Sequence, residues 1–168
     1  MKKRYFLWAG TAMLGTAWLS RHVPGTRAEM ATTNSQKTSS FEITKTEQEW
    51  RKILTPEQFK VLRQEGTELP GTSALNQQHG EGTFACAACA LPLFTSATKF
   101  DSGTGWPSFY APIEGAVDTT TDTSLFMTRV EVHCHRCGGH LGHVFDDGPK
   151  PTGKRYCMNG VAMTFIPG

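Results

Sequence analysis

Five cysteines give this chain its most obvious chemistry, because four of them form two matched pairs and the fifth stands apart. Cys86 and Cys89 enclose two residues, as do Cys134 and Cys137, whereas Cys157 has no such neighbour. Two Cys-x-x-Cys pairs can present four thiolates tetrahedrally to Zn²⁺, each pair on its own turn. We therefore expect one structural zinc site that joins two distant parts of the fold.

Two alternatives to this zinc site remain open from the sequence. An exported protein folds in an oxidising compartment, where the same four cysteines can form two disulfides. His133 and His135 flank the second pair and offer imidazole ligands, but four thiols with matched spacing suit Zn²⁺ better. We expect both histidines on the surface.

Cys157 has no partner in this chain if the other four thiols bind a metal. In an extended segment alternate side chains share a face, so Arg155 and Asn159 flank its sulfur. A guanidinium stabilises a thiolate by Coulomb attraction, and an amide donates a hydrogen bond to the sulfur or to a substrate oxygen. Cys157 is either a reactive thiol, the interpretation we favour, or a small buried hydrophobe.

Three separated blocks of sequence resemble the signatures of B-type peptide methionine-R-sulfoxide reductases. The blocks are Gly105-Trp106-Pro107-Ser108-Phe109, His140-Leu141-Gly142-His143-Val144-Phe145 and Arg155-Tyr156-Cys157-Met158-Asn159. The likeness covers residues 46–168 and includes both cysteine pairs, at positions where zinc-containing members carry them. It implies a mainly β fold, a β-tent of two antiparallel sheets with short N-terminal helices, and a structural zinc far from the chemistry.

The resemblance also implies a reaction, the reduction of the R epimer of methionine sulfoxide in oxidised proteins. Cys157 is then the nucleophile that attacks the sulfoxide sulfur and is left as a sulfenic acid. His143 is our first choice for the acid that protonates the departing oxygen, with His140 in support, since an imidazole titrates near neutral pH. Residues three apart in a straight strand face opposite sides, so both histidines reach one pocket only if Gly142 allows a bend.

Two aromatic residues are candidates for the wall of the substrate pocket. Trp106 suits the methyl group of the substrate, because a methyl beside a polarised sulfur packs well against an aromatic face. Phe109 either completes this wall or belongs to the hydrophobic core.

The chain departs from the family pattern at Thr104. Many members carry a resolving cysteine in the Ser-Gly-x-Gly-Trp-Pro turn, where this sequence has threonine. A threonine cannot condense with a sulfenic acid, so an external thiol must restore Cys157. We expect a reductant of the thioredoxin or glutaredoxin kind as a partner.

Two other functions compete with this interpretation. One is a zinc-stapled binding module without catalysis, in which Cys157 is buried. The other is a thiol oxidoreductase or peroxidase that uses Cys157, which ranks lower because neither Cys-x-x-Cys lies in a βαβ context and Cys157 has no resolving partner.

The elements that must position these residues can be read from caps and turns. Residues 46–54 predict a short helix, and Thr55-Pro56-Glu57-Gln58 predicts the start of a second helix that Gly66 closes. Beyond it, proline and glycine divide short strands, such as those expected at residues 83–86 and 125–132.

The N-terminal residues indicate export. Lys2, Lys3 and Arg4 precede an uncharged stretch, residues 5–19, that is too short to span a bilayer comfortably. We expect a signal peptide over residues 1–28, cleaved after Thr26-Arg27-Ala28, with the Sec route, the twin-arginine route and an uncleaved anchor as alternatives. Residues 29–45 are polar and predict a flexible tether, and residues 46–168 then form one catalytic domain.

The charge of the mature chain excludes some partners. Residues 1–28 hold five basic residues and no acidic one, so their removal changes the formal net charge from +2 to −3. A mildly acidic domain without a lysine and arginine cluster lacks the electrostatic footprint that nucleic acids require. We expect neither nucleic acid nor a membrane as a partner of the mature domain.

Overall fold

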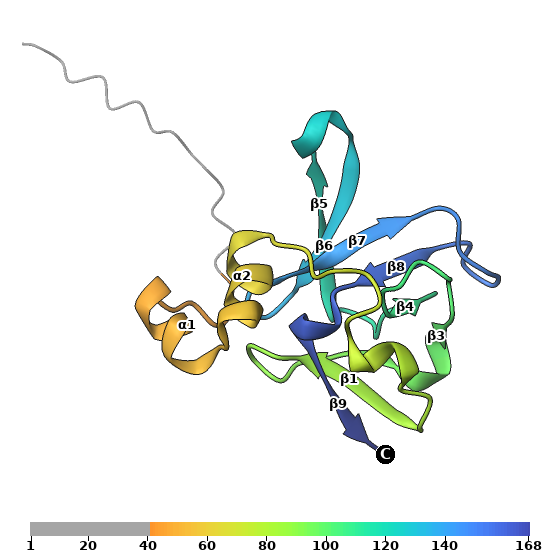
Figure 1. Ribbon diagram of the computed structural model, residues 1–168, viewed down its shortest axis with the longest axis horizontal. Helices are drawn as coiled ribbons and strands as arrows, with labels where there is room; N and C mark the ends of the chain where they lie inside the picture. Colours follow the sequence, from red (N-terminus) through yellow and green to blue (C-terminus); the bar gives the residue numbers. More distant parts are fainter. Residues whose placement is uncertain (1–40) are drawn as a thin grey trace, which may run out of the picture. The chain divides into compact units, whose positions relative to one another are not determined.

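The computed structural model describes residues 41–168, so the predicted signal peptide and most of the predicted tether lie outside the described residues. In this part the chain is mainly β, with two antiparallel sheets and two short α-helices (Figure 1). The predicted fold class is therefore confirmed. None of the helices within residues 41–168 is long and apolar enough to cross a membrane.

Two capped helices open the domain. They are α1 (Glu47–Ile53) and α2 (Pro56–Gln64), and each begins with a reciprocal capping box between its N-cap threonine and the residue three positions on. The second helix ends at Gln64, two residues before the predicted Gly66, because Glu65 itself takes the left-handed conformation with φ 53°. The buried face of α2 packs against the larger sheet through Phe59, Val61 and Leu62.

The smaller sheet has three strands in the order β2-β1-β9. Their bounds are β1 (Gly82–Cys86), β2 (Pro92–Thr95) and β9 (Met163–Pro167). Cys86, the last residue of β1, pairs with Met163. The first cysteine pair therefore lies at the end of this sheet.

The larger sheet has six strands in the order β3-β4-β8-β7-β6-β5. Their bounds are β3 (Lys99–Phe100), β4 (Ser108–Phe109), β5 (Val117–Asp122), β6 (Arg129–Cys134), β7 (His140–Phe145) and β8 (Arg155–Met158). Short 3-10 turns punctuate the chain at η1 (Ala74–Gln77), η2 (Ser96–Thr98), η3 (Ser124–Phe126) and η4 (Gly160–Ala162). Cys157 lies inside this sheet, paired with Ser108 on one side and His143 on the other.

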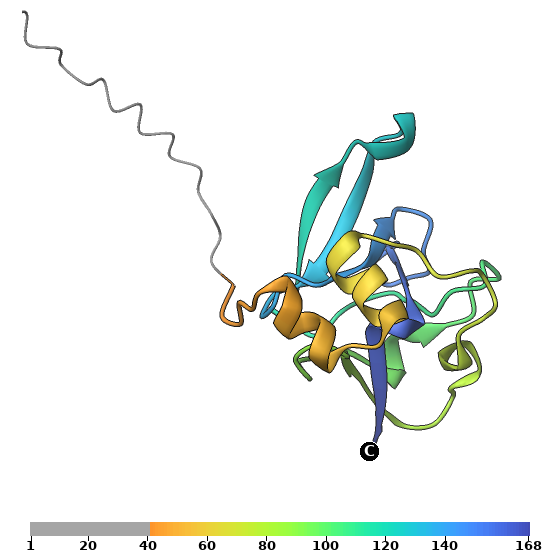
Figure 2. The same ribbon diagram turned by 60° about the vertical axis from the view of Figure 1, so that its left-hand side comes forward.

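The strand expected at residues 125–132 begins later than predicted. The 3-10 turn η3 closes the β5–β6 hairpin, and β6 starts only at Arg129. Phe126 has φ 58° and a fully exposed side chain, so it breaks the alternation that the sequence pattern indicated. The hairpin projects from the rest of the domain in both ribbon views (Figures 1 and 2).

Aromatic side chains fill the core between the two sheets. Phe109 stacks on Phe94 with ring centroids 4.3 Å apart, and Phe84 packs against it edge-on at 4.9 Å. All three rings are fully buried. Phe109 therefore has no surface left to contact a ligand. Of the two positions predicted for this ring, the hydrophobic core is correct and the wall of the substrate pocket is wrong.

The described chain already contacts the domain before the predicted boundary at residue 46. The backbone N–H of Ile43 donates to the carbonyl of Arg136 at 3.0 Å, and the ring of Phe41 meets His133 edge-on at 5.8 Å. Residues 41–43 therefore pack against the turn between β6 and β7. His133 is half-buried there, which corrects its expected place on the surface.

Candidate active site and metal site

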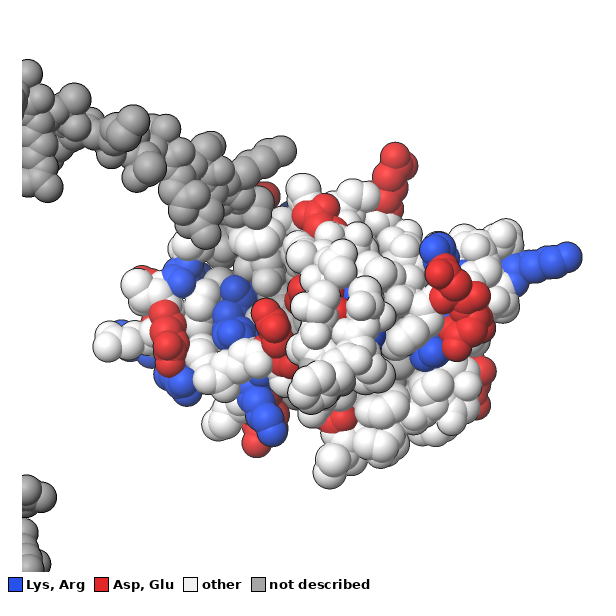
Figure 3. All heavy atoms as spheres, turned by 90° about the horizontal axis from the view of Figure 1, so that it is seen from above, with Lys and Arg blue, Asp and Glu red and all other residues white. Residues whose placement is uncertain are grey.

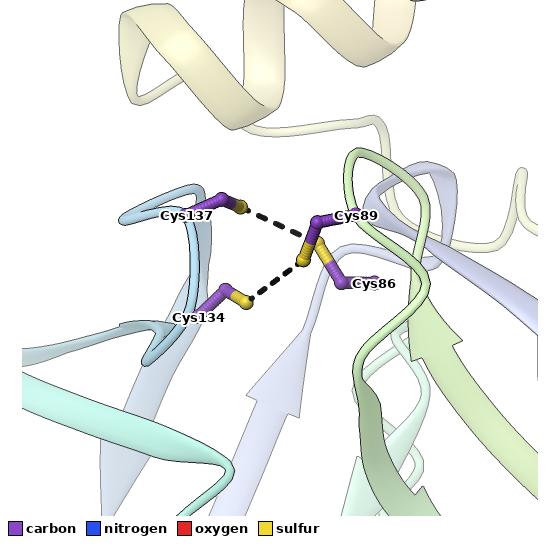
Figure 4. Close-up of side chains that lie close together, drawn as sticks. All are labelled: Cys86, Cys89, Cys134 and Cys137. Carbon is purple, nitrogen blue, oxygen red and sulfur yellow. Dashed lines mark hydrogen bonds between the residues drawn. The ribbon is translucent and has the colours of Figure 1, made fainter. Parts of the chain in front are cut away.

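The four paired cysteines come together from the two sheets. One pair closes the turn after β1 and the other closes the turn between β6 and β7 (Figure 4). The Sγ atoms of Cys86 and Cys137 are 3.8 Å apart and those of Cys89 and Cys134 are 3.5 Å apart, and all four lie within 4.8 Å of one another. Four Zn–S bonds of about 2.3 Å in a tetrahedron separate the sulfurs by about 3.8 Å, whereas a disulfide needs about 2.05 Å. The four cysteines are placed to bind one metal ion.

The surroundings of this metal site suit a cluster of thiolates. Arg63 on α2 donates to Sγ of Cys137 at 3.3 Å and to its carbonyl at 3.0 Å, while its guanidinium lies over the ring of Trp50 at 4.3 Å. The arginine brings positive charge to the sulfurs and ties α2 to the second cysteine turn. His135 is exposed and bonds to Asp118, so it is not part of the cluster.

Cys157 opens into a different cavity, on the larger sheet. This pocket has a volume of about 130 Å³. Four of the predicted site residues border it together: Cys157, His143, Asn159 and Trp106. The remaining wall comes from Thr67, Arg129, Gly142 and Phe145.

The sulfur of Cys157 lies among hydroxyl groups instead of thiols. Its Sγ is 3.9 Å from Oγ1 of Thr104, and Ser102 Oγ links that threonine to Ser108 at 2.8 Å and 2.7 Å. Burial raises the pKa of the Cys157 thiol, and the hydrogen bond with Thr104 and the positive charge of Arg155 oppose this rise. Because burial has the largest effect, the sulfur is a protonated thiol at neutral pH.

Arg155 is held firmly beside Cys157. Its guanidinium donates to both carboxylate oxygens of Asp147, at 2.8 Å and 2.9 Å, and lies over the ring of Phe145 at 4.4 Å. The hydrogen bond to Asp147 raises the pKa of Arg155 further, so the guanidinium keeps its charge. That charge favours the anionic form of the neighbouring sulfur.

His140 and His143 share one side of the sheet despite their spacing of three. Their ring centroids are 5.5 Å apart. A register shift in the β6–β7 pairing leaves Leu141 as an extra residue, so the bend exists as a β-bulge. A Cβ on Gly142 would lie 2.1 Å from the carbonyl oxygen of Cys157, and this close approach explains why glycine is needed there.

Each histidine is held by a carboxylate that no sequence pattern reveals. Nε2 of His143 lies 2.8 Å from Oδ2 of Asp122, and Nδ1 of His140 lies 2.8 Å from Oε1 of Glu131. Glu131 lies on β6, which pairs with β7, and Asp122 lies on β5, the next strand beyond β6. Only the pairing of β5, β6 and β7, which the sequence spacing does not disclose, identifies them as site residues.

These carboxylates also set the charge state of the histidines. Burial lowers the pKa of His143, and the hydrogen bond with Asp122 opposes this. Hydrogen bonds from Ser124 and His143 hold the pKa of the Asp122 carboxyl far below its usual range, and Arg129 donates to the same oxygen at 2.6 Å. His143 is therefore a neutral imidazole held by an ionised carboxylate at neutral pH.

Asn159 stabilises the β-bulge from outside the strand. Its backbone N–H and its Nδ2 both donate to the carbonyl of Leu141, at 2.8 Å and 3.0 Å, and its Oδ1 accepts from the N–H of Glu68 at 2.9 Å. The amide therefore fixes the segment that carries both histidines. The Nδ2 group of Asn159 carries a second hydrogen that the bond to Leu141 does not use, and Asn159 borders the pocket.

Trp106 is anchored through the same loop. Its indole N–H donates to the carbonyl of Glu68 at 3.1 Å, and the Glu68 carboxylate accepts from the backbone N–H groups of Gly160 and Val161. The loop after α2 thereby links the aromatic wall of the pocket to the turn after Cys157. Like the two carboxylates, Glu68 lacks any motif that would have identified it.

Comparisons with known proteins give one consistent result. The SelR domain family matches residues 54–167 of this chain. A protein named peptide methionine sulfoxide reductase MsrB from Leptospira interrogans is 53% identical over 127 residues, which cover 75% of this chain and 97% of the relative. Proteins of the same name from Methanosarcina barkeri and Pseudomonas putida are each 58% identical, over 124 and 126 residues, which cover 73% and 74% of this chain and 87% and 95% of the relatives.

Proposed function

Because the chain belongs to the SelR domain family, we propose that it is a peptide methionine sulfoxide reductase that reduces the R epimer with Cys157 as its nucleophile. One observation carries this proposal: Cys157, His143 and Trp106, from three separate segments, border the same small cavity. A thiol, an imidazole and an aromatic wall are the groups needed to attack a sulfoxide, protonate its oxygen and hold its methyl group.

The first half of the reaction transfers one oxygen atom from substrate to enzyme. The Cys157 thiol loses its proton as its sulfur attacks the sulfoxide sulfur, and His143 relays a proton to the sulfoxide oxygen. The attack joins the two sulfurs, and the oxygen then passes to the Cys157 sulfur as the S–O bond of the substrate and the new S–S bond break. The methionine side chain leaves in its reduced form, and Cys157 carries the oxygen as a sulfenic acid. A buried thiol beside a neutral imidazole fits this order of steps, because neither group is charged until substrate arrives.

Two further residues stabilise the charges that form on His143 and Cys157 during this step. Asp122 holds the ring of His143 and stabilises the imidazolium that forms when the thiol proton moves. Arg155 stabilises the negative charge that develops on the Cys157 sulfur as its proton leaves. We assign His140 and Asn159 a supporting role, since Glu131 and the bulge carbonyl of Leu141 fix them in place.

The second half of the reaction restores the thiol. Thr104 lies beside the sulfur but has no thiol to condense with a sulfenic acid. A first external thiol displaces the oxygen as water and forms a mixed disulfide with Cys157, and a second thiol releases Cys157 and leaves as a disulfide. A thioredoxin- or glutaredoxin-like protein supplies these two thiols.

The metal ion at the four cysteines is Zn²⁺ in this proposal, and its role is structural. Four thiolates leave no open position for substrate on a tetrahedral zinc. Cys86, Cys89, Cys134 and Cys137 would hold the ion and bind the end of the smaller sheet to the β6–β7 turn. The site of repair is proposed to be beyond the cytoplasmic membrane, since the basic and apolar N-terminal residues predict an export signal.

The decisive experiment uses separate epimers. The full chain is incubated with dithiothreitol and either the R or the S epimer of a peptidyl methionine sulfoxide, with a Cys157→Ser variant of equal zinc content as control. We expect turnover of the R epimer alone, abolished in the control. A zinc-loaded chain without any turnover indicates the non-catalytic binding module, and consumption of peroxide without methionine sulfoxide turnover indicates the peroxidase.

A further inference from the structure

A second and larger depression adjoins the Cys157 pocket. It has a volume of about 680 Å³ and runs between the end of α2 and the β5–β6 hairpin. Thr67, Arg129 and His143 border both spaces, so the depression lies directly beside the pocket. We term it the hairpin groove; its walls are Gln64, Glu65 and Thr67 on the helix side and residues 120–124 with Arg129 on the hairpin side.

Two large apolar side chains lie in the hairpin turn between Ser124 and Arg129, which both line this groove. Met127 is 53% exposed and Phe126 is fully exposed. Arg129 and Glu131 both line the groove. Met127 has an extended backbone and lies two residues before Arg129, in the same alternation as these two residues. Because side chains alternate along an extended chain, Met127 faces the same side as the groove.

The conformation of Phe126 keeps its ring away from the core. Its φ of 58° lies in the left-handed region, which bulky residues seldom adopt, and the turn presents the ring to solvent. Figure 3 views the domain from the side toward which the hairpin points, and uncharged side chains make up most of the middle of this face, with a few acidic and basic atoms visible between them. An exposed aromatic ring beside an exposed methionine, next to a groove, is suited to apolar contacts with a partner.

We propose that the hairpin groove binds the residues that flank methionine sulfoxide in an extended, unfolded segment of an oxidised protein, with an apolar side chain of that segment on Phe126 and Met127. This inference rests on the proposed function. The Cys157 pocket has room for about one side chain, so the rest of a peptide must lie outside it, and the groove is the larger depression beside it. An extended peptide advances about 3.3 Å per residue, so a few flanking residues span the groove.

The groove favours an apolar segment over a charged one. Apart from Glu65 at the end of α2, its charged residues are already paired: Asp122 with Arg129 and His143, and Glu131 with His140. Uncharged threonine side chains also border the groove, namely Thr120 and Thr121 on β5 together with Thr67 and Thr123. A protein that has unfolded after oxidation exposes the apolar segments that this surface accepts, whereas a folded protein hides them.

The test compares a substrate that fills only the pocket with one that also needs the groove. The first is the R epimer of N-acetylmethionine sulfoxide methylamide, and the second is a short peptide with the same sulfoxide between leucine and phenylalanine residues. Both are used with the full chain in single turnovers without reductant, measuring methionine released. The variant is Phe126→Gly with Met127→Ser, because glycine tolerates the φ of this turn. The control is Ile53→Ser, an apolar residue on α1 that is about as exposed as Met127.

We expect the hairpin variant to lose roughly fivefold in kcat/KM for the peptide and nothing for the small substrate, because only the peptide buries apolar surface on the hairpin. The Ile53→Ser control should match the parent with both substrates. Equal rates of parent and hairpin variant on the peptide would overturn the proposal. If the parent itself reduces neither substrate, the proposed function fails instead.

Discussion

The two cysteine sites show how the surroundings of a thiol determine its role. At the metal site each sulfur has other sulfurs as neighbours, within 4.8 Å, and an arginine that donates directly to one of them. At the second site Cys157 has hydroxyl groups, Arg155 and a carboxylate-held histidine around it, and a cavity in front of it. Four thiols facing one point form a binding site that closes on a metal, whereas one thiol facing a cavity remains free to react.

The largest effect that we predict is a loss of stability when a cysteine of the metal site is replaced. Cys134→Ser removes one of four ligands, and metal binding contributes on the order of 10 kcal/mol to folding in small zinc domains. We expect loss of bound zinc and of a cooperative unfolding transition, measured by zinc content and denaturant unfolding. Cys157→Ser is the matched variant and should keep both. A Cys134→Ser chain that unfolds like the parent would contradict a structural role for the metal.

The next largest effect concerns the acid at the second site. His143→Gln should lower kcat on the R epimer by about 10²- to 10⁴-fold, the usual contribution of a positioned proton donor. Asp122→Asn should lower it less, by about tenfold, because the ring stays in place but loses the stabilisation of its charged form. Both variants should keep zinc and stability, and a rate equal to that of the parent in His143→Gln would exclude this residue as the acid.

The Asp122→Asn variant also gives a prediction about pH. The Asp122 carboxylate raises the pKa of His143 against the effect of burial, so its loss lowers that pKa further. The part of the rate profile that reports protonation of His143 should therefore move to lower pH. A shift to higher pH, or no shift together with reduced activity, would mean that Asp122 acts by a route other than His143.

A smaller effect is expected when the second site is given a thiol of its own that can reduce the sulfenic acid of Cys157. Oγ1 of Thr104 is 3.9 Å from the Cys157 sulfur, so a thiol introduced by Thr104→Cys lies within reach of the sulfenic acid. After one turnover without reductant, thiol titration should show two thiols lost in this variant and one in the parent. Loss of only one thiol in the variant would show that the turn cannot approach the sulfur closely enough for a disulfide.

The smallest effect concerns the thiolate itself. Removal of the positive charge in Arg155→Met should raise the pKa of Cys157 above its already raised value. The thiolate fraction at pH 8 then falls, and alkylation of Cys157 by iodoacetamide should slow by about three- to tenfold. Alkylation in the parent should accelerate as pH rises toward 9. A faster reaction in Arg155→Met would contradict the account of this site.

Local patterns in the sequence were enough to predict part of this molecule. The capping boxes and the two Cys-x-x-Cys pairs depend on residues three positions apart, so the helices and the metal site were predictable. The pocket residues Cys157, His143 and Trp106 were found through their blocks of sequence. These features need no knowledge of how the strands pair.

Features that depend on tertiary pairing were missed. Asp122 and Glu131 reach the histidines only because β5, β6 and β7 lie side by side. Phe109 was left between wall and core because its neighbours, Phe84 and Phe94, come from the other sheet. The start of this strand was predicted too early because Phe126, Val130 and Val132 share one parity, although Phe126 lies in a turn and faces solvent.

The most direct test of the contrast between the two sites is the stoichiometry of one turnover. The zinc-loaded chain is mixed with excess R epimer of a peptidyl methionine sulfoxide and no reductant, and methionine formed, thiols lost and zinc released are measured together. We predict one methionine and one oxidised cysteine per chain, located at Cys157 by mass spectrometry, with the zinc still bound. Release of zinc with a disulfide between Cys157 and one of the other four cysteines would contradict the account, because the metal site would then take part in the chemistry.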